Sequence, residues 1–299
     1  MSSYSSTSIE GNPLPLAEVK KILKNHPNHI SDSQKEVLNY NKALLWLNSQ
    51  IGENKGVKFD EKLILLIHQC VMKGLLINAK CGSFRKEPVF VNDSAQRKTV
   101  YWAPDHQVVQ GLINELIYFI KNNLKDMDPV ILSGILHKQF IIIHPFIDGN
   151  GRTVRLLTKV LLAGMGLDTF NLFSFENYYN RNVSKYFDNV GVRGNYYDLA
   201  GSVEFTPWLE YFAEGILDEL FRVSKELEKA VVDPSTELKD HHRKIIEYIE
   251  KNGYISDREY SKMTVRAKPT RALDFGKLIE LGLIERKGKG KATFYKLKK

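Results

Sequence analysis

The sequence has little cysteine and no long apolar run. Its two cysteines, Cys70 and Cys81, fit neither a disulfide framework nor a metal-ligand spacing, so a reducing, cytoplasmic compartment is the simplest expectation. No uninterrupted apolar stretch reaches the roughly 18 residues of a transmembrane helix, and we expect no membrane span. The start, MSSYSSTSIEGN, lacks the basic and apolar regions of a secretory signal.

Net charge is absent from most of the chain. Residues 1–235 hold 26 Lys and Arg against 26 Asp and Glu, whereas residues 236–299 hold 17 against 9. The whole net charge of +8 therefore lies in the tail, which suggests a second unit with a separate task. We place the boundary near Pro234, in the segment DPSTELKD.

Apolar residues at three- and four-residue steps predict that the first unit is mainly α. The expected helices cover residues 16–23, 33–51, 60–76, 106–124, 128–143, 151–166 and 205–231. In residues 81–104, apolar and polar residues alternate instead, and turn residues separate them. This pattern predicts a β-hairpin. The tail is expected to form helices at 241–253, 256–263 and 268–282 and a basic hairpin at 283–297. This is the order of a small α/β winged-helix domain.

The stretch HPFIDGNGRTVR, residues 144–155, is the most informative part of the sequence. Pro145, Gly149 and Gly151 disfavour a continuous helix, so it is predicted to be a loop that opens a new helix near Asn150. Its glycines allow positive φ, and successive N–H groups can then converge at the positive end of the helix dipole. Such a loop binds phosphate.

The charged residues around this loop suit phosphate chemistry. Arg152 and Arg155 lie three apart on one helix face, and guanidinium groups bind phosphate in a bidentate manner. The Asp148 carboxylate, next to bound phosphates, is a natural Mg²⁺ ligand. His144 can accept a proton at neutral pH. Together they predict transfer of a nucleotide's phosphorus to a hydroxyl; the alternative is an ordinary helix corner with incidental charges.

This stretch resembles the signature of the Fic family, His-Pro-Phe-x-Asp/Glu-Gly-Asn-Gly-Arg-x-x-Arg, with every fixed position filled. The resemblance implies a Fic-type helical bundle over roughly residues 1–225 and transfer of AMP from ATP to a Ser, Thr or Tyr hydroxyl of a target protein or of itself. It implies a role for each motif residue, which we give in chain order: His144 as base, Asp148 on Mg²⁺, Gly149, Asn150 and Gly151 around the phosphates, and Arg152 on the β-phosphate.

The hairpin resembles the family's flap, about residues 82–102, with Gly82, Phe84 and Arg85 in a Gly-x-aromatic-Arg opening. Its edge strand is expected to pair with an extended target segment; the alternative is a hairpin that only covers the core. Where many relatives have Tyr-x-Pro-Pro, this chain departs and has Tyr101-Trp102-Ala103-Pro104. Downstream, NRNVSKYF resembles a segment near the nucleotide, which makes Arg181 and Asn182 candidates for adenosine contacts.

The N-terminal segment, residues 1–15, is expected to inhibit the catalytic domain at 16–232. On local rules Thr7 and Glu10 form a capping box followed by Gly11. Ser6-x-x-x-Glu10-Gly11 also matches the family's inhibitory motif, Ser/Thr-x-x-x-Glu-Gly/Asn. The resemblance implies that Glu10 pairs with Arg155 and takes the place of the γ-phosphate. The reverse reaction, removal of AMP, stays an alternative for this glutamate.

The basic tail, residues 233–299, is a candidate for duplex DNA contact through its phosphates. The alternatives are a homodimer contact or target binding. The second reading of the whole chain is therefore a DNA-binding regulator with the Fic unit as a nucleotide sensor. The candidate contacts are Lys268, Arg271, Lys277, Lys287, Lys289 and Lys291.

Overall fold

The computed structural model describes residues 1–25, 30–52, 58–93, 98–167, 169–170, 173–199, 201–230, 238–288 and 290–298. The chain forms two compact units, Met1–Val223 and Ser224–Lys299, and the division falls inside the long helix α11 (Thr206–Ala230). The boundary predicted near Pro234 lies outside the described residues. We describe each unit by itself.

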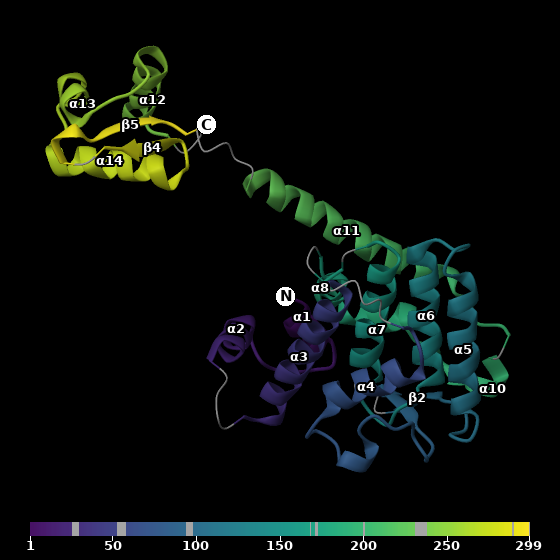
Figure 1. The fold of residues 1–299 in the computed structure, drawn as a ribbon. Helices are drawn as coiled ribbons and strands as arrows, with labels where there is room; N and C mark the ends of the chain where they lie inside the picture. Colours follow the sequence, from purple (N-terminus) through teal and green to yellow (C-terminus); the bar gives the residue numbers. More distant parts are fainter. Residues whose placement is uncertain are drawn as a thin grey trace. The chain divides into compact units, whose positions relative to one another are not determined.

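The first unit is built of helices, which confirms the predicted mainly α class (Figure 1). Before α11 they are, in chain order, α1 (Ser2–Ile9), α2 (Leu16–Asn25), α3 (Asp32–Gly52), α4 (Glu61–Met72), α5 (Val109–Asn123), α6 (Pro129–Ile143), α7 (Asn150–Gly164), α8 (Phe175–Arg181), α9 (Val183–Val190) and α10 (Tyr196–Leu199).

Helices α6 and α7 form the centre of this unit and pack against each other, with α5 beside α6 and with α3 and α4 on α7 (Figure 1). Almost every side chain of α7 up to Leu162 is buried, including its charged ones. Apolar residues of α3 to α7 form one core cluster, and aromatic residues around Trp208 form a second. The core therefore surrounds the segment that joins α6 to α7.

Local sequence fixes both ends of that connection. Asp128 caps α6, because its carboxylate accepts hydrogen bonds from Val130 N at 2.8 Å and Ile131 N at 3.2 Å. The helix stops at His144, whose φ of 50° is left-handed, and Gly149 starts α7 with a φ of 78°. The predicted loop is thus held rigidly between two buried helices.

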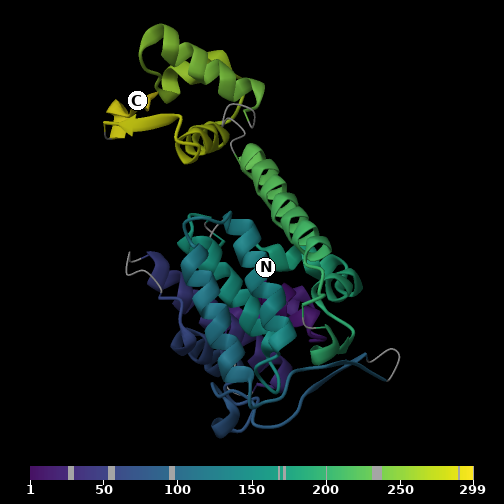
Figure 2. The same cartoon turned by 90° about the vertical axis from the view of Figure 1, so that its right-hand side faces the viewer.

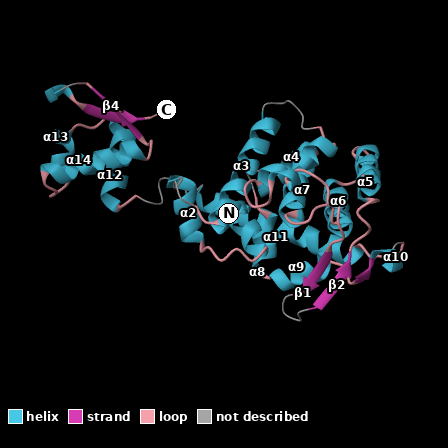
Figure 3. Cartoon of the chain, turned by 90° about the horizontal axis from the view of Figure 1, so that it is seen from below, coloured by secondary structure: helices cyan, strands magenta, loops and turns pink. Residues whose placement is uncertain are grey.

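The strands of this unit form a small sheet of order β1-β2-β3 at one margin of the helices (Figure 3). Strands β1 (Phe90–Asp93) and β2 (Lys98–Trp102) are antiparallel with a bulge after Val91, and β2 is parallel to the short β3 (Gly194–Asn195). The hairpin segment projects from one end of the helical unit (Figure 2). Strand β1 is an edge strand, as the flap prediction requires.

The second unit has the predicted order of three helices and a hairpin. These are α12 (Asp240–Asn252), α13 (Asp257–Met263), α14 (Lys268–Glu280), β4 (Ile284–Lys287) and β5 (Phe294–Leu297). Its core contains the stacked rings of Phe275 and Tyr295, whose centroids are 4.0 Å apart. Across the described residues of both units, no helix combines the length and apolarity that crossing a membrane requires.

Candidate active site

The His144 side chain lies at the end of α6, and its hydrogen bond defines which ring nitrogen carries the proton. Its Nδ1 is 3.2 Å from the carbonyl oxygen of Ile141, which can only accept a hydrogen bond. Nδ1 therefore carries the ring proton and the lone pair is on Nε2. Burial lowers the pKa of His144 to about 4, so the imidazole is neutral at pH 7. A neutral ring with a free Nε2 can accept a proton.

Arg85 fixes the backbone of this turn. Its Nε donates to the His144 carbonyl at 2.8 Å and its backbone N to the Pro145 carbonyl at 3.0 Å, and its guanidinium also donates to the Pro104 carbonyl. The side chain is buried, with 3% of its surface exposed. The prediction of Arg85 as a target-docking residue is therefore corrected, since it positions the motif from inside.

The next part of the loop, Asp148 and Gly149, presents one carboxylate to solvent. Gly149 must be glycine, because its φ is 78° and an added Cβ would lie 2.6 Å from Met72 Sδ. Asp148 Oδ1 accepts from Gly149 N at 2.5 Å and from Arg152 Nη2 at 3.2 Å. The Asp148 side chain is 56% exposed, so its remaining lone pairs face solvent. One open carboxylate beside a phosphate loop fits the ligand set of Mg²⁺.

Asn150 locks the loop rather than presenting its side chain to a ligand. Its Nδ2 donates to the Phe146 carbonyl at 2.9 Å, and its Oδ1 accepts from Phe146 N at 3.0 Å. Both the donor and the acceptor of this side chain, which was predicted to bind ATP, are thus hydrogen-bonded within the loop. The backbone N–H groups of Asn150, Gly151 and Arg152 open α7 and have no carbonyl one turn earlier to bond. They are the donors this loop offers to an anion.

Arg152 is a buried cation with unused donors. Only 2% of the residue is exposed, and its Nη1 lies 3.1 Å from Glu36 Oε1 on α3. Its Nε and Nη1 are buried without a hydrogen-bond partner of good geometry. Buried donors of this kind are costly unless something accepts from them. An anionic ligand in the loop would supply the acceptors.

Arg155 is fully buried and is held by the N-terminal segment. Its Nη2 donates to Glu10 Oε1 at 2.7 Å and to the Ser6 carbonyl at 2.9 Å, and its Nε donates to Ser6 Oγ at 2.7 Å. Burial acts to lower the pKa of the guanidinium, but the Glu10 carboxylate together with Tyr186 and Tyr40 raises it above the usual value. The predicted contact between Glu10 and Arg155 is present in this structure.

Glu10 lies directly on the start of α7. A Cβ added to Gly151 would collide with Glu10 Oε1 and would lie 2.9 Å from Arg155 Nη1. Gly151 therefore leaves room for the carboxylate against the helix N-terminus. A carboxylate at this place occupies the same positive end of the helix that a phosphate would use.

The local prediction for the N-terminal helix is wrong in one respect. Thr7 is not an N-cap, because α1 begins at Ser2 and Thr7 lies in its last turn. Its hydroxyl donates to the Ser3 carbonyl at 2.8 Å and to the Tyr4 carbonyl at 3.1 Å. Burial of this short helix against α3, α7 and α8 supplies the stability that its own length cannot.

His68 is a site residue that sequence reasoning missed. Its Nδ1 accepts from Gly82 N at 2.9 Å, its Nε2 donates to the Asp148 carbonyl at 3.0 Å, and its ring stacks on Phe146 with 3.7 Å between centroids. Burial lowers its pKa to about 4. The ring joins the first residue of the flap to the motif loop. A single histidine within the apolar run LILLIHQCV was the available signal.

Tyr186 and His137 are a second missed pair. The Tyr186 hydroxyl lies 3.5 Å from Arg155 Nη1 and 3.1 Å from His137 Nε2. His137 Nδ1 in turn lies 3.1 Å from Thr158 Oγ1. Burial lowers the pKa of His137 well below its usual value, so this buried ring is neutral. Tyr186 thus links Arg155 to the buried His137.

The flap prediction holds for the edge strand and not for its opening residues. Gly82 has a φ of 70° and no room for a Cβ, which would lie 2.9 Å from Gln69 Cβ. Phe84 packs on the core, with its ring 5.5 Å from that of Phe146. Phe90 and Trp102 are the exposed apolar side chains of the paired strands. Target docking thus stays a prediction for the edge of β1.

Arg181 and Asn182 make contacts within the protein, and their assignment to the adenosine stays a prediction. Arg181 forms ion pairs with Asp218 at 2.7 Å and Glu219 at 3.0 Å on α11. The Asn182 side chain caps α9 by accepting from Lys185 N at 3.0 Å. Tyr186, one turn further along, is the residue of this segment that approaches the motif.

In the second unit, some candidate DNA contacts are paired with acidic side chains and others are exposed. Arg271 donates to both carboxylate oxygens of Asp257, at 2.8 and 3.0 Å, so it is corrected to an intramolecular partner. Lys287 lies 2.9 Å from Glu285, and Lys268 is exposed. Lys277 lies 3.8 Å from Glu280. Lys289 and the side chain of Lys291 lie outside the described residues.

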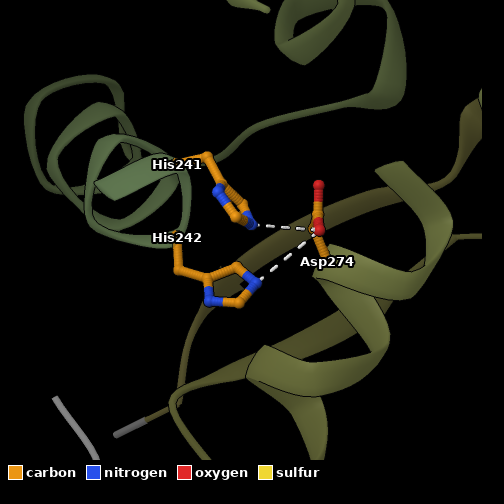
Figure 4. Close-up of side chains that lie close together, drawn as sticks. All are labelled: His241, His242 and Asp274. Carbon is orange, nitrogen blue, oxygen red and sulfur yellow. Dashed lines mark ion pairs between the residues drawn. The ribbon is translucent and has the colours of Figure 1, made fainter. Parts of the chain in front are cut away.

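His241, His242 and Asp274 bring possible metal ligands within 4.8 Å of one another in the second unit (Figure 4). The two Nε2 atoms lie 3.3 and 3.7 Å from Asp274 Oδ1. However, Arg266 holds both oxygens of that carboxylate, at 2.8 and 3.0 Å, and Tyr260 donates to it at 2.9 Å. A dication would therefore sit beside a guanidinium, and we assign the cluster to folding of this unit.

The fold and the loop define a class before any comparison is made. It is a helical domain whose central helix begins after a glycine turn. The first N–H groups of that helix have no backbone acceptor, and its buried Arg152 has a donor without a partner. A neutral histidine with a free Nε2 ends the preceding helix. Backbone donors at a helix N-terminus suit a phosphorylated ligand, and the histidine would place a base in the same loop.

Comparison with known proteins shows which family this domain is similar to. Residues 58–162 match the model of the Fic/DOC family. Over 168 residues it is 30% identical to a protein adenylyltransferase fic-1 of Caenorhabditis briggsae and to a protein adenylyltransferase Fic of Nematostella vectensis. These matches cover 54% of this chain but 31% and 37% of those proteins, so the chain spans about a third of their length.

Solved structures show the same fold. A Fic family protein from Desulfovibrio desulfuricans G20 superposes with a TM-score of 0.63 at 21% identity, over 99% of this chain and 85% of that one. Residues 134–508 of Fic-1 from Caenorhabditis elegans give 0.59 at 20% identity, over 77% and 63% of the two chains. The predicted Fic-type helical fold is therefore confirmed.

Proposed function

We propose that this chain is a protein adenylyltransferase that moves AMP from ATP to a hydroxyl of a target protein or of itself. The name that the curated relatives bear supports this reaction. The observation that carries it is the pairing of a neutral His144, free at Nε2, with the buried and underused donors of Arg152 across one short loop. A base and an anion site so close together suit attack on a bound phosphate.

In this proposal His144 Nε2 takes the proton of the target hydroxyl as its oxygen attacks the α-phosphorus. The new bond is oxygen to phosphorus, the bond that breaks joins the α-phosphorus to the bridging oxygen, and pyrophosphate leaves. The first N–H groups of α7 and Arg152 stabilise the charge that develops on the leaving phosphates. Asp148 would hold Mg²⁺, which neutralises phosphate charge when it is bound.

The N-terminal helix acts as an inhibitor in this proposal. Glu10 takes Arg155 and lies on the start of α7, where a third phosphate would go. Two negative groups cannot share that place without a large electrostatic cost. ATP would then bind in an unproductive position or not at all until α1 moves.

The test is labelling with α-³²P-ATP and Mg²⁺ in the presence of a cell lysate. We expect Glu10→Gly to raise the label on protein about a hundredfold over wild type, since one charge pair and one repulsion are removed together. Adding His144→Ala to that variant should abolish the label. Equal labelling of wild type and Glu10→Gly, with ATP still bound by both, would disprove the inhibitory role.

A γ-³²P-ATP lane serves as the matched control for the transferred group. Label from the γ position and not from the α position would mean phosphoryl transfer and would contradict the proposed reaction. Absence of any label in all variants, at saturating ATP, would contradict the transferase itself.

A further inference from the structure

The turn that follows the inhibitory helix carries a second polar side chain, that of Asn12. Glu10 N donates to the Thr7 carbonyl at 3.0 Å and Asn12 N to the same carbonyl at 3.1 Å, while Gly11 between them has a φ of 88°. This closed turn holds Glu10 and Asn12 in a fixed relation to each other. Any movement of α1 therefore moves both side chains.

Asn12 reaches helix α3 and grips an acidic residue there. Its Nδ2 donates to Glu36 Oε2 at 2.8 Å and to the Ser33 carbonyl at 2.8 Å. Its Oδ1 accepts from Leu14 N at 3.1 Å, which fixes the orientation of the amide. The Glu36 carboxylate is thus held at one oxygen by the N-terminal segment.

The other oxygen of Glu36 faces the phosphate site. Glu36 Oε1 lies 3.1 Å from Arg152 Nη1, and Arg152 Nη2 lies 3.2 Å from Asp148 Oδ1 on the other side. The guanidinium is buried between these two carboxylates, and its Nε has no partner. Arg152 is consequently pulled toward α3 and toward Asp148 instead of being free to meet a ligand.

We propose that Glu36 is a positioning residue through which the N-terminal segment controls Arg152, in parallel with the control of Arg155 by Glu10. The proposal rests on the proposed function for the identity of the ligand, a nucleoside triphosphate. Asn12 orients Glu36, and Glu36 competes with a phosphate for Arg152 and adds a like charge beside it. One short segment thereby withholds both arginines of the motif.

The inhibitory helix then has two contacts that act at different phosphates. Removing the Glu10 carboxylate takes one acceptor from Arg155, which keeps its bonds to Ser6, and leaves Asn12 and Glu36 in place, because α1 is still held by its buried residues. Full release requires either departure of the whole segment or loss of the Glu36 charge as well. A Glu10→Gly variant is therefore only partly active.

The experiment measures ATP affinity by titration calorimetry, and the KM and kcat of AMP transfer, in the Glu10→Gly background with Mg²⁺. We expect the isosteric Glu36→Gln to tighten ATP binding and lower KM about five- to tenfold with kcat within about twofold, since one like charge is removed. Glu61→Gln is the matched control, because Glu61 also accepts from a side-chain amide, that of Gln110, at 2.6 Å but on α4. Unchanged or weaker ATP binding in Glu36→Gln would overturn the proposal.

A second measurement does not depend on ATP. Thermal unfolding of Asn12→Ala, Glu36→Gln and the double variant, without ligand, forms a double-mutant cycle. We expect the double variant to be destabilised by clearly less than the sum of the single effects, because both changes break the same contact. Additive effects would overturn the link. If Glu10→Gly binds no ATP, the proposed function fails, and this cycle alone still decides whether Asn12 and Glu36 are coupled.

Discussion

The two units use positive charge in opposite ways. In the first unit, whose sequence is close to neutral, Arg152, Arg155 and Lys159 are buried in a single helix. In the second, which holds the excess charge of the chain, Lys268 is exposed and Arg271 is engaged by Asp257. Burial, and not net charge, therefore marks the place where a cation is kept for a ligand, because a buried cation needs a partner to offset its desolvation.

The buried cations themselves differ in a way that refines this lesson. Lys159 lies 3.1 Å from Glu176, with both side chains fully buried, and Tyr40 donates to the same carboxylate at 2.9 Å. That pair is complete within the protein and joins α7 to α8. Arg152, in contrast, lies between the carboxylates of Glu36 and Asp148 and still leaves its buried Nε without an acceptor, which indicates a ligand site.

The largest effect we expect comes from the underused arginine. Arg152→Ala in the Glu10→Gly background should lower AMP transfer about 10²- to 10³-fold, because it removes a preorganised donor for the leaving phosphates. Rates are measured with α-labelled ATP and either a target or the chain itself as acceptor. Lys268→Ala in the same background should leave the rate unchanged. A rate for Arg152→Ala within twofold of its parent would break the contrast between the units.

The pH profile of transfer should reflect the lowered pKa of the His144 imidazole. Burial lowers the pKa of His144 to about 4, so the base stays unprotonated as the pH falls from 8 to 5, and the rate in Glu10→Gly should stay nearly constant. A ring with an ordinary pKa of about 6.5 would lose about thirtyfold over that range. A loss of that size, with the protein still folded by circular dichroism, would contradict the lowered pKa of His144.

The smallest effect belongs to the second unit. We expect Lys268→Ala to reduce affinity for duplex DNA about two- to threefold at low salt and to have no measurable effect at physiological salt, because a single exposed lysine contributes one phosphate contact. Fluorescence anisotropy with a labelled duplex measures this. Sequence-selective binding that survives physiological salt would instead favour the DNA-binding alternative and would require reconsidering the role of the exposed charge.

The sequence was most predictive where local rules and chemistry agree. The break at Pro145 and the glycines placed the loop and the start of α7 at Asn150, as observed. The contact between Glu10 and Arg155 was expected from the motif pattern, yet Thr7 was predicted to cap a helix and instead lies in the last turn of α1, just before Glu10. The serines of α1 form a helix because burial on the first unit stabilises it, which is a tertiary effect that local propensity cannot contain.

Other site residues could not be foreseen because their roles depend on contacts between distant segments. Asn12 and Glu36 are ordinary polar residues in sequence, and only packing brings them to Arg152. Arg85 matched a flap pattern, but its guanidinium turned inward to the carbonyl of His144. Arg181, which spacing assigned to the ligand, forms an ion pair with α11 in this structure.

The central claim is that the turn between α6 and α7 grips a triphosphate beside the His144 ring. The most direct measurement is a crystal structure of Glu10→Gly soaked with Mg²⁺ and a non-hydrolysable ATP analogue. The account requires the phosphates to lie against the N–H groups of Gly151 and Arg152, with His144 Nε2 facing the α-phosphorus. Density for the nucleotide elsewhere, with Arg152 still bound to Glu36 and Asp148, would contradict it.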